Sequence, residues 1–241
     1  MLYPYSLSIV IPVFNEEENI APLLKAINRT VPSICADYEI ILVDDASTDS
    51  SGEMLDAVAG TDRRVKVLHH ERNRTLGGSL RTGFNAATKD LILYFDADLP
   101  FDLKEIAKAI AMLDAEDADY FSAYRTSRGG EGVRRFFYSY IYNGLIELLF
   151  RLGVKDVNFS FKLFKRSFLN EIRLSSEGSF INVEMLARVR MSGRKIVQFP
   201  CDYHPRTRGR STLSSFKVIV KILDELTRFF FWRREKQEMR T

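Results

Sequence analysis

The sequence predicts an α/β fold with a mostly parallel central sheet and helices on both of its faces. Two observations predict this fold class. Short apolar runs rich in β-branched residues alternate with amphipathic stretches of helical length. The runs are also apolar at successive positions, which is typical of strands that helices cover on both sides.

Four strand–helix units make up the first half of the chain. The predicted strands occupy residues 7–14, 38–43, 65–68 and 91–95. Each strand ends in a polar or glycine-bearing cluster and is followed by a predicted helix. Ligands of such sheets bind at the carboxyl ends of the strands. We therefore expect the acidic residues of this half to converge on one edge of the sheet.

Length and composition indicate a single globular domain. The chain has 241 residues, of which 46% are apolar and 28% charged, and this excludes a disordered or fibrous protein. Two cysteines, Cys35 and Cys201, are too few for a disulfide framework and favour a reducing compartment. The first residues lack the pattern of a secretory signal, and no uncharged apolar run is long enough to span a membrane.

Charge is distributed unevenly along the chain. Residues 1–120 hold 11 Lys and Arg against 21 Asp and Glu, whereas the remainder holds 24 against 11. An acidic half suits a bound cation, and a basic half suits phosphate groups or a membrane surface. A solvated charged surface is the simpler explanation that this pattern leaves open.

Asp96 and Asp98 directly follow the predicted strand at 91–95. Two carboxylates one residue apart at a strand end suit a turn in which both reach one divalent cation, directly or through water. Mg²⁺ or Mn²⁺ needs more ligands than two carboxylates, so substrate phosphates would complete the shell. Helix capping is the alternative role, but Asp102 is better placed to cap the next helix, which is expected to begin near Leu103.

A second alternative for this motif is the aspartyl nucleophile of phosphatases, whose first carboxylate attacks phosphorus. That chemistry is usually built on the first strand of its fold, whereas this motif ends the fourth strand and is followed by Leu99. Asp44 and Asp45 also stand at a strand end. Turn formation and capping there need only residues 47–49, so the second acidic pair indicates a further role.

Four motifs of the first half, in this order and spacing, resemble the nucleotide-sugar-binding half of family 2 inverting glycosyltransferases. They are PVFNEEEN (12–19), VDDASTD (43–49), NRTLGGSLRTGF (73–84) and DADL (96–99). Four segments of the second half resemble the branch that includes dolichyl-phosphate mannose synthase and other polyprenyl-phosphate glycosyltransferases. They are DVNFSFKLFKRS (156–167), EML (184–186), QFP (198–200) and RTRGRST (206–212).

The resemblance implies a GT-A type, Rossmann-like fold and a single catalytic domain over residues 1–241. Residues 1–120 would bind the nucleotide sugar and the metal, residues 121–213 would form the acceptor half, and residues 214–241 an amphipathic C-terminal helix. The implied reaction is the metal-dependent, inverting transfer of a sugar from a GDP- or UDP-linked donor to a polyprenyl phosphate. The implied cofactor is Mg²⁺ or Mn²⁺.

The resemblance also assigns roles to individual residues. Those expected to bind the nucleotide sugar are Pro12, Phe14, Glu16, Asp44, Asp45, Asp96, Asp98, Arg206 and Ser211. Asp96 and Asp98 would hold the metal, and the expected catalytic residues are Asp98 and Arg206. Some positions depart from the usual residues of the family, with Phe14 in place of Tyr, Pro100 of Gln, Ser160 of Gly and Thr212 of Lys.

The acceptor is inferred from the chemistry of its nucleophile. A phosphate monoester has a second pKa of about 6, so it is largely ionised at neutral pH and attacks without a general base. A hydroxyl acceptor would need such a base, and the closest match to the acid of hydroxyl-using relatives is Glu184. The sequence therefore favours a phosphate acceptor. Arg125, Arg134 and Arg135 are the candidates for gripping it, with surface solvation as their alternative role.

Two segments of the basic half suit a membrane surface. Residues 134–152 form an aromatic stretch of helical length, for which a core helix is the alternative. Residues 214–234 place apolar residues between basic ones and end in FFFWRR, the pattern of an interfacial helix or of a stem leading to membrane spans outside this chain. We expect a cytoplasmic protein, peripherally associated with the cytoplasmic face of a membrane, with no nucleic-acid partner and with a membrane-spanning subunit as an optional one.

Three other functions stay open. A family member could instead glycosylate a hydroxyl of a lipid or polysaccharide, or the chain could be a non-catalytic nucleotide-sugar-binding subunit. The intact Asp96 and Asp98 argue against a decayed site. A nucleotidyltransferase shares the sheet and the metal chemistry, but it usually begins with a glycine-rich loop and a lysine, where this chain has residues 12–19.

Overall fold

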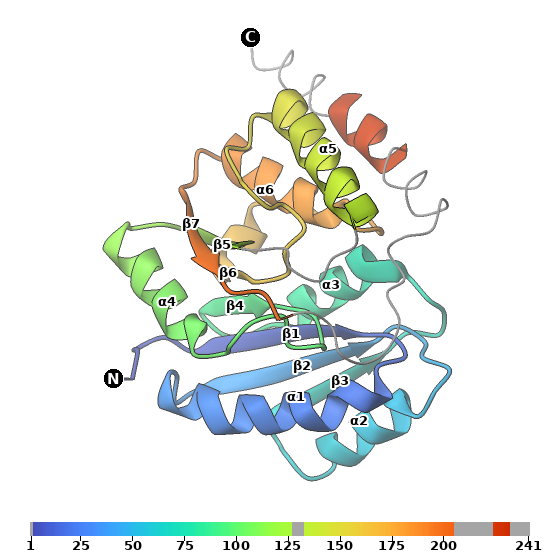
Figure 1. The fold of residues 1–241 in the computed structure, drawn as a ribbon. Helices are drawn as coiled ribbons and strands as arrows, with labels where there is room; N and C mark the ends of the chain where they lie inside the picture. Colours follow the sequence, from blue (N-terminus) through green and yellow to red (C-terminus); the bar gives the residue numbers. More distant parts are fainter. Residues whose placement is uncertain (1, 127–132, 205–223, 232–241) are drawn as a thin grey trace.

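The computed structural model describes residues 2–126, 133–204 and 224–231, with only the backbone described for residues 133–140. They include a seven-stranded sheet with the order β3-β2-β1-β4-β6-β5-β7 (Figure 1). Its strands are β1 (Leu7–Val13), β2 (Tyr38–Asp44), β3 (Val65–His69), β4 (Leu91–Tyr94), β5 (Tyr120–Arg125), β6 (Lys162–Lys165) and β7 (Ile196–Cys201). The helices are α1 (Glu17–Thr30), α2 (Ser51–Ala59), α3 (Thr75–Ala86), α4 (Glu105–Ala115), α5 (Val133–Phe150) and α6 (Ile181–Met191), with short 3₁₀ helices η1 (Val31–Ser33) and η2 (Arg166–Asn170). A further helix spans residues 224–231.

The sheet is mostly parallel. β1 pairs with β2 and β4, and β2 pairs with β3, all in parallel, as β5 does with β7. β6 alone runs antiparallel to its neighbours β4 and β5. The expected fold class is confirmed, and the four strands predicted in the first half match β1 to β4 to within about a residue at either end.

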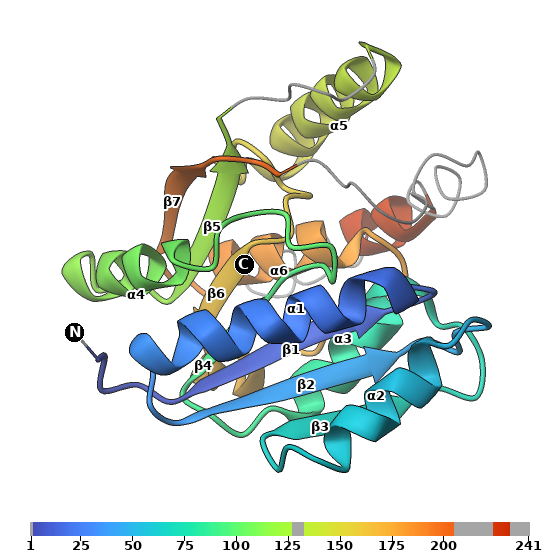
Figure 2. The ribbon, with the colours of Figure 1, turned by 60° about the horizontal axis from the view of Figure 1, so that its bottom comes forward.

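Helices cover both faces of the sheet. Figures 1 and 2 show α1 and α2 on one face of the β1–β3 half and α3 on the opposite face. Side chains of β1 alternate accordingly. Ile9 and Ile11 join the core cluster that includes residues of α1 and α4, whereas Val10 joins the cluster that includes residues of α3, α5 and α6.

α5 buries one side and exposes another. Ile146 and Phe150 are buried, as the core alternative for this segment requires, whereas Ile141 and Leu148 are 62% and 76% exposed. Within the described ranges, no helix combines the length and the apolar character that crossing a membrane requires. The exposed side of α5 therefore remains a candidate for a surface contact.

The helix at 224–231 packs beside α5. The ring of Phe150 lies 5.8 Å from that of Phe229 and 6.3 Å from that of Phe230, between ring centroids. Phe229 is only 5% exposed and Phe231 is 61% exposed. The side chains of the aromatic residues 229–231 therefore do not all face the same side of the helix. Phe229 belongs to the core, which corrects its expected place on a lipid-facing surface, and Trp232 lies outside the described residues.

α3 lies unusually close to the sheet at Gly83. A Cβ atom added at Gly83 would stand 2.3 Å from Cγ1 of Val10 and 3.2 Å from Cγ2 of Val43. Both valines belong to strands inside the sheet, and their β-branched side chains have little freedom to move aside. The absence of a side chain at Gly83 therefore sets the distance between α3 and the sheet.

β6 carries a lysine that has no exposed surface. Nζ of Lys162 donates a hydrogen bond to Oγ of Ser122 at 2.6 Å and another to the carbonyl oxygen of Asp156 at 3.5 Å. Burial lowers the pKa of Lys162 to about 7, the carboxylate of Asp156 opposes this shift, and the guanidinium of Arg125 adds to it. The folded protein therefore releases this proton at a lower pH than the unfolded chain.

Replacing Gly83 by Ala should destabilise the fold by about 1 to 3 kcal/mol, because the added methyl group overpacks the contact with Val10. Gly144→Ala is the matched control, since Gly144 is exposed in α5 and nothing lies within 4 Å of its added Cβ. The control should be neutral or stabilising by up to about 1 kcal/mol. Urea unfolding measures both variants, and equal effects would contradict the close approach at Gly83.

Lys162 should make stability rise with pH. Between pH 7 and 9 the unfolded chain holds a proton on this lysine that the folded protein has released, so the free energy of unfolding should increase by at most about 1.4 kcal/mol per pH unit. Denaturant unfolding at pH 7, 8 and 9 measures the slope. Lys162→Met should lose this part of the slope, whereas Lys165→Met, a partly exposed position on β6, should keep it. Parallel slopes in all three proteins would show that the pKa of Lys162 is not lowered.

Candidate functional site

The loops at the carboxyl ends of β1 to β4 share an uncommon backbone conformation. Asn15, Ala46, Thr75 and Leu99 follow β1, β2, β3 and β4 respectively, and all four adopt the left-handed conformation, with φ between 54° and 60°. Such residues cost free energy and are held in place by the surrounding structure, and they concentrate at functional sites. The strained loops therefore mark the edge of the sheet where the sequence predicts ligand binding.

Hydrogen bonds join the β1–α1 loop to the β2–α2 loop. The backbone N–H of Asn15 donates to Oγ of Ser47 at 3.0 Å, and Oδ1 of Asn15 accepts from the N–H of Thr48 at 2.7 Å. The N–H of Glu16 donates to Oγ of Ser51 at 2.9 Å. These bonds hold the β1–α1 loop, with the half-buried Phe14, against the β2–α2 loop.

Asp44 and Asp45 are buried and are both bonded to histidines. Oδ2 of Asp44 lies 2.9 Å from Nδ1 of His69, and Oδ1 accepts from the N–H of Ser47. Burial raises the pKa of Asp44, but the hydrogen bonds from Ser47 and His69 outweigh it and hold the pKa below its usual value. Hydrogen bonds to Asp56 and then Asp44 raise the pKa of His69.

Asp45 has a different pattern of contacts. Its Oδ1 lies 2.7 Å from Nδ1 of His70 and also accepts from the N–H of Arg74 at 2.7 Å. The other ring nitrogen of His70 contacts Oγ1 of Thr82 at 2.9 Å. Both histidines thus tie the β3 end to neighbouring side chains. Among the described residues, both carboxylate oxygens of Asp44 take part in hydrogen bonds. The side-chain hydrogen bonds of Asp45 all involve Oδ1.

Asp96 and Asp98 follow β4 and are partly exposed. The hydroxyl of Tyr94 donates to Oδ1 of Asp96 at 3.5 Å, and the backbone N–H of Asp96 points to Oγ of Ser160 at 3.4 Å. Oδ1 of Asp102 accepts from the N–H of Lys104 at 3.0 Å in the turn before α4, but α4 begins at Glu105 and no described side chain caps its N-terminus, so the expected cap by Asp102 is wrong. Asp96 and Asp98 are therefore not needed to start α4.

The donor set at Asp96 and Asp98 fits a cation that is shared with a substrate. Within the described ranges, no group of three or more His, Cys, Asp or Glu side chains surrounds one point. Two hard carboxylate ligands are what Mg²⁺ or Mn²⁺ uses when phosphate oxygens and water complete an octahedral shell. The residues present thus suit a metal that arrives with a diphosphate, rather than a closed protein site.

The two acidic pairs flank the end of β1. In the sheet, Val13 pairs with Asp44 on β2, and Val10 pairs with Tyr94 on β4. Neighbouring strands lie about 4.8 Å apart, so β2 and β4 lie roughly 10 Å apart on either side of β1. The predicted loop with Pro12, Phe14 and Glu16 lies between them. This layout suits an elongated ligand with a polar ring at one end and a diphosphate at the other.

Arg125 forms a buried ion pair at the end of β5. Nε and Nη2 of Arg125 donate to the two carboxylate oxygens of Asp156 at 2.7 and 3.1 Å, and both side chains are less than 10% exposed. The guanidinium also lies over the rings of Phe159 and Tyr203, at 5.7 and 5.3 Å from their centroids. Asp156 thus holds Arg125 in place at the last residue of β5, two residues before the segment 127–132.

Four other predicted site residues lie where the structure gives no side-chain geometry. Arg134 and Arg135 belong to α5, but their side chains are outside the described atoms. Arg206 and Ser211 lie outside the described residues, as does the segment 127–132. The roles predicted for these residues stay predictions.

Glu184 is an internal structural acid. It has no exposed surface, and its carboxylate accepts from the N–H groups of Ser175 and Ser176 and from the guanidinium of Arg188. Burial raises its pKa, but these hydrogen bonds outweigh that effect and leave the pKa of Glu184 below its usual value. A carboxylate held in this way has no lone pair directed at a substrate.

The loop held by Glu184 supports the start of α3, a contact that sequence reasoning missed. The carbonyl oxygen of Glu177 accepts from Oγ1 of Thr75 and from the N–H of Gly77, at 2.5 and 2.6 Å. Oε1 of Glu225, on the last described helix, accepts from the N–H groups of Glu177 and Gly178. The signal in the sequence is Gly77, where a Cβ would lie 2.4 Å from the carbonyl oxygen of Ser176.

Several curated proteins are similar to this chain. Glycosyltransferase AglD of Haloferax volcanii is 31% identical over 206 residues, which are 83% of this chain and 33% of that protein. Dodecaprenyl-phosphate galacturonate synthase of Rhizobium johnstonii is 28% identical, over 94% of this chain and 67% of that protein. Undecaprenyl-phosphate 4-deoxy-4-formamido-L-arabinose transferase of Proteus mirabilis is 29% identical, over 91% and 66%. The chain thus spans about a third of the first relative and about two thirds of the others.

Solved structures share the fold. Glucosyl-3-phosphoglycerate synthase of Mycobacterium tuberculosis superposes with a TM-score of 0.69 at 19% identity, over 92% of this chain and 80% of that one. The mannosyltransferase PcManGT of Pyrobaculum calidifontis, solved with GDP-Man and Mn²⁺, gives 0.64 at 18% identity, over 94% and 65%. These similarities confirm the expected GT-A type fold.

A family model agrees with the sheet and with the motifs at its edge. The model, described as glycosyl transferase family 2, matches residues 8–173. This range contains β1 to β6 and every first-half motif that resembled this family. The chain belongs to glycosyl transferase family 2.

Proposed function

We propose that this chain transfers a sugar, with inversion and with a divalent metal, from a nucleoside diphosphate sugar to a polyprenyl phosphate at a membrane surface. The observation that carries the proposal is the layout of the rim, the edge of the sheet at the carboxyl ends of β1, β2 and β4. There, one acidic pair on each side flanks the loop at 12–16. The names of two relatives, which describe transfer to dodecaprenyl and undecaprenyl phosphate, support the acceptor class.

The donor would lie across the end of β1, with its base toward β2 and its diphosphate toward β4. Asp45 is the better candidate for the base contact, because the hydrogen bonds on Asp44 occupy both of its oxygens. The hydrogen bonds on Asp45 gather on Oδ1 and leave Oδ2 for a donor group of the base. Phe14 would pack against the ribose or the base from the neighbouring loop.

Asp96 and Asp98 would hold Mg²⁺ or Mn²⁺ together with the donor diphosphate. When bound, this cation supplies positive charge that stabilises the departing diphosphate. Tyr94 and Ser160 position Asp96 from the side of β4 and β6. Arg206 and Ser211 are proposed to complete the phosphate contacts.

The acceptor is proposed to be a phosphate because the chain offers no base at the position where hydroxyl-using relatives carry one. Glu184 is closed off by Ser175, Ser176 and Arg188. Arg125 is a fixed cation near the acceptor half, and Asp156 orients it. We propose that Arg125, with Arg134 and Arg135, attracts the acceptor phosphate.

The acceptor lipid implies contact with a membrane. We propose that the protein associates peripherally with the cytoplasmic face, through the exposed side of α5 and the C-terminal segment. Ile141, Leu148 and Phe231 are large exposed apolar side chains of this end of the molecule. Apolar insertion and basic attraction would act together there. A membrane-spanning segment or subunit would be supplied by parts of the protein outside this chain or by a partner.

The proposed function is tested by Asp98→Asn with a short-chain polyprenyl phosphate and a panel of GDP- and UDP-sugars. Transfer should fall by more than 100-fold, because one of the two carboxylate ligands is lost. The fold should be intact, since Asp98 is partly exposed at a strand end. Asp102→Asn makes the same chemical change beside α4 and should retain transfer. Full activity of Asp98→Asn would overturn the proposed metal role.

Glu184→Gln separates the two classes of acceptor. The variant should lose about 2 to 4 kcal/mol of stability, because a buried, hydrogen-bonded charge is removed. In folded protein, kcat should fall less than tenfold, against the 10²- to 10⁴-fold loss typical of removing a general base. Unfolding curves and single-turnover rates at low temperature measure the two effects separately. A loss above 100-fold in folded protein would indicate a hydroxyl acceptor.

A further inference from the structure

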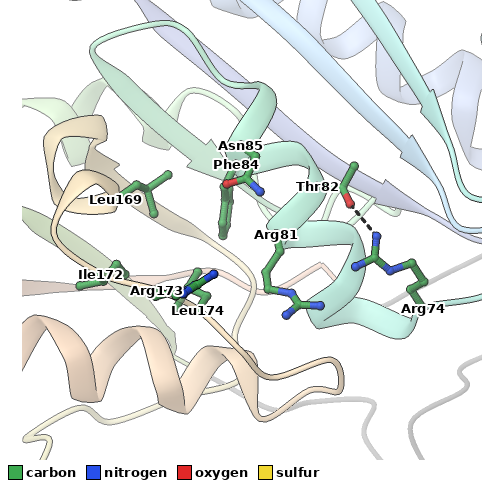
Figure 3. Close-up of a pocket in the computed structure, with 9 residues that line it drawn as sticks. All are labelled: Arg74, Arg81, Thr82, Phe84, Asn85, Leu169, Ile172, Arg173 and Leu174. Carbon is green, nitrogen blue, oxygen red and sulfur yellow. Dashed lines mark hydrogen bonds between the residues drawn. The ribbon is translucent and has the colours of Figure 1, made fainter.

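A pocket of about 390 Å³ lies between α3 and the segment 169–174 (Figure 3). Arg74, the residue before α3, and Arg81, within α3, reach it from one side, and Arg173 reaches it from the facing segment. Apolar side chains, among them Phe84 and Leu169, form another part of the lining. The pocket thus combines three cations with an apolar wall.

The cations of this pocket are poorly neutralised by the protein. None of the described residues that line it is acidic. Among the described residues, the guanidinium of Arg74 contacts only Oγ1 of Thr82, at 3.5 Å, and Arg173 forms no hydrogen bond or ion pair. Arg81 donates to the carbonyl oxygen of Ser175 at 3.1 Å and reaches Glu177 at 3.4 Å, but the carboxylate of Glu177 is half exposed and stands outside the lining. Positive charge in a concave site concentrates an anion.

The geometry selects the kind of anion. Arg81 and Arg173 extend from opposite walls of the pocket, and Arg74 stands just before α3, seven residues from Arg81 in the sequence (Figure 3). Several guanidinium groups around one space suit the oxygens of a phosphate group, because each presents N–H donors in a planar fork. The side chains of Phe84 and Leu169 suit an apolar part of the same ligand.

We propose that this pocket is a second anion site, which binds a phosphate group attached to a small apolar body. Two sources share this chemistry, a phospholipid headgroup and a soluble phosphate ester. The site goes beyond the proposed transfer reaction, since it uses none of the residues assigned to the donor, the metal or the acceptor.

Binding of phenyl phosphate to the full chain tests the proposal, with isothermal titration calorimetry in a metal-free buffer. Without metal, the carboxylates at Asp96 and Asp98 repel the probe from the donor end. Arg173→Gln should weaken the affinity roughly tenfold, because it removes one charge-assisted contact. Arg63→Gln is the matched control, since Arg63 is exposed, lies on the loop before β3 and lines no part of the pocket. It should bind as the unmodified protein does.

Vesicles distinguish the two sources of the ligand. Sedimentation with phosphatidylcholine vesicles, with and without phosphatidylglycerol, measures the contribution of anionic headgroups. A phosphatidylglycerol-dependent loss of binding in Arg173→Gln, but not in Arg63→Gln, identifies a lipid headgroup. A loss confined to phenyl phosphate identifies a soluble ester. If Arg173→Gln matches Arg63→Gln in both assays, the proposal is wrong. Neither assay involves sugar transfer, so the outcome is independent of the proposed function.

Discussion

Negative charge crowded onto one end of a parallel sheet is the constraint that shapes this molecule. Asp44, Asp45, Asp96 and Asp98 all follow strands that point the same way. The two pairs are accommodated differently. The first is buried and bonded to histidines of the β3 end, whereas the second stands partly exposed beside Tyr94 and Ser160. The fold thus buries one acidic pair and leaves the other partly exposed, and this arrangement supports the proposed binding of a cation together with a diphosphate.

The regular strands and helices could be predicted from the sequence. The tertiary contacts that hold the candidate site in place could not. Apolar runs bounded by polar clusters are local signals, so β1 to β4 and the rim residues could be predicted. The reversal of β6 between β4 and β5 depends on pairing between distant segments, and no local pattern encodes it. Glu184 matched a catalytic position in the sequence, yet its burial beneath Ser175 and Ser176 gives it a structural role. Such a distinction is visible only when the tertiary neighbours are known.

The neighbouring strands β5 and β6 each carry a buried basic side chain. Lys162 and Arg125 approach the same residue, Asp156, one through its carbonyl oxygen and the other through its carboxylate. The carboxylate of Asp156 holds the guanidinium of Arg125, which also lies over the rings of Phe159 and Tyr203. The orientation of Arg125 is therefore fixed by the interior of the sheet, so a phosphate that meets this residue would find it already in place.

The hydrogen bonds between Glu225 and the loop at 177–178 connect the last described helix to α3. Glu225 holds this loop by two backbone N–H groups, and the same loop caps the start of α3. The helix is therefore fixed to the body of the protein through this loop. A displacement of this helix would therefore reach the loop at 177–178 and, through that loop, the start of α3.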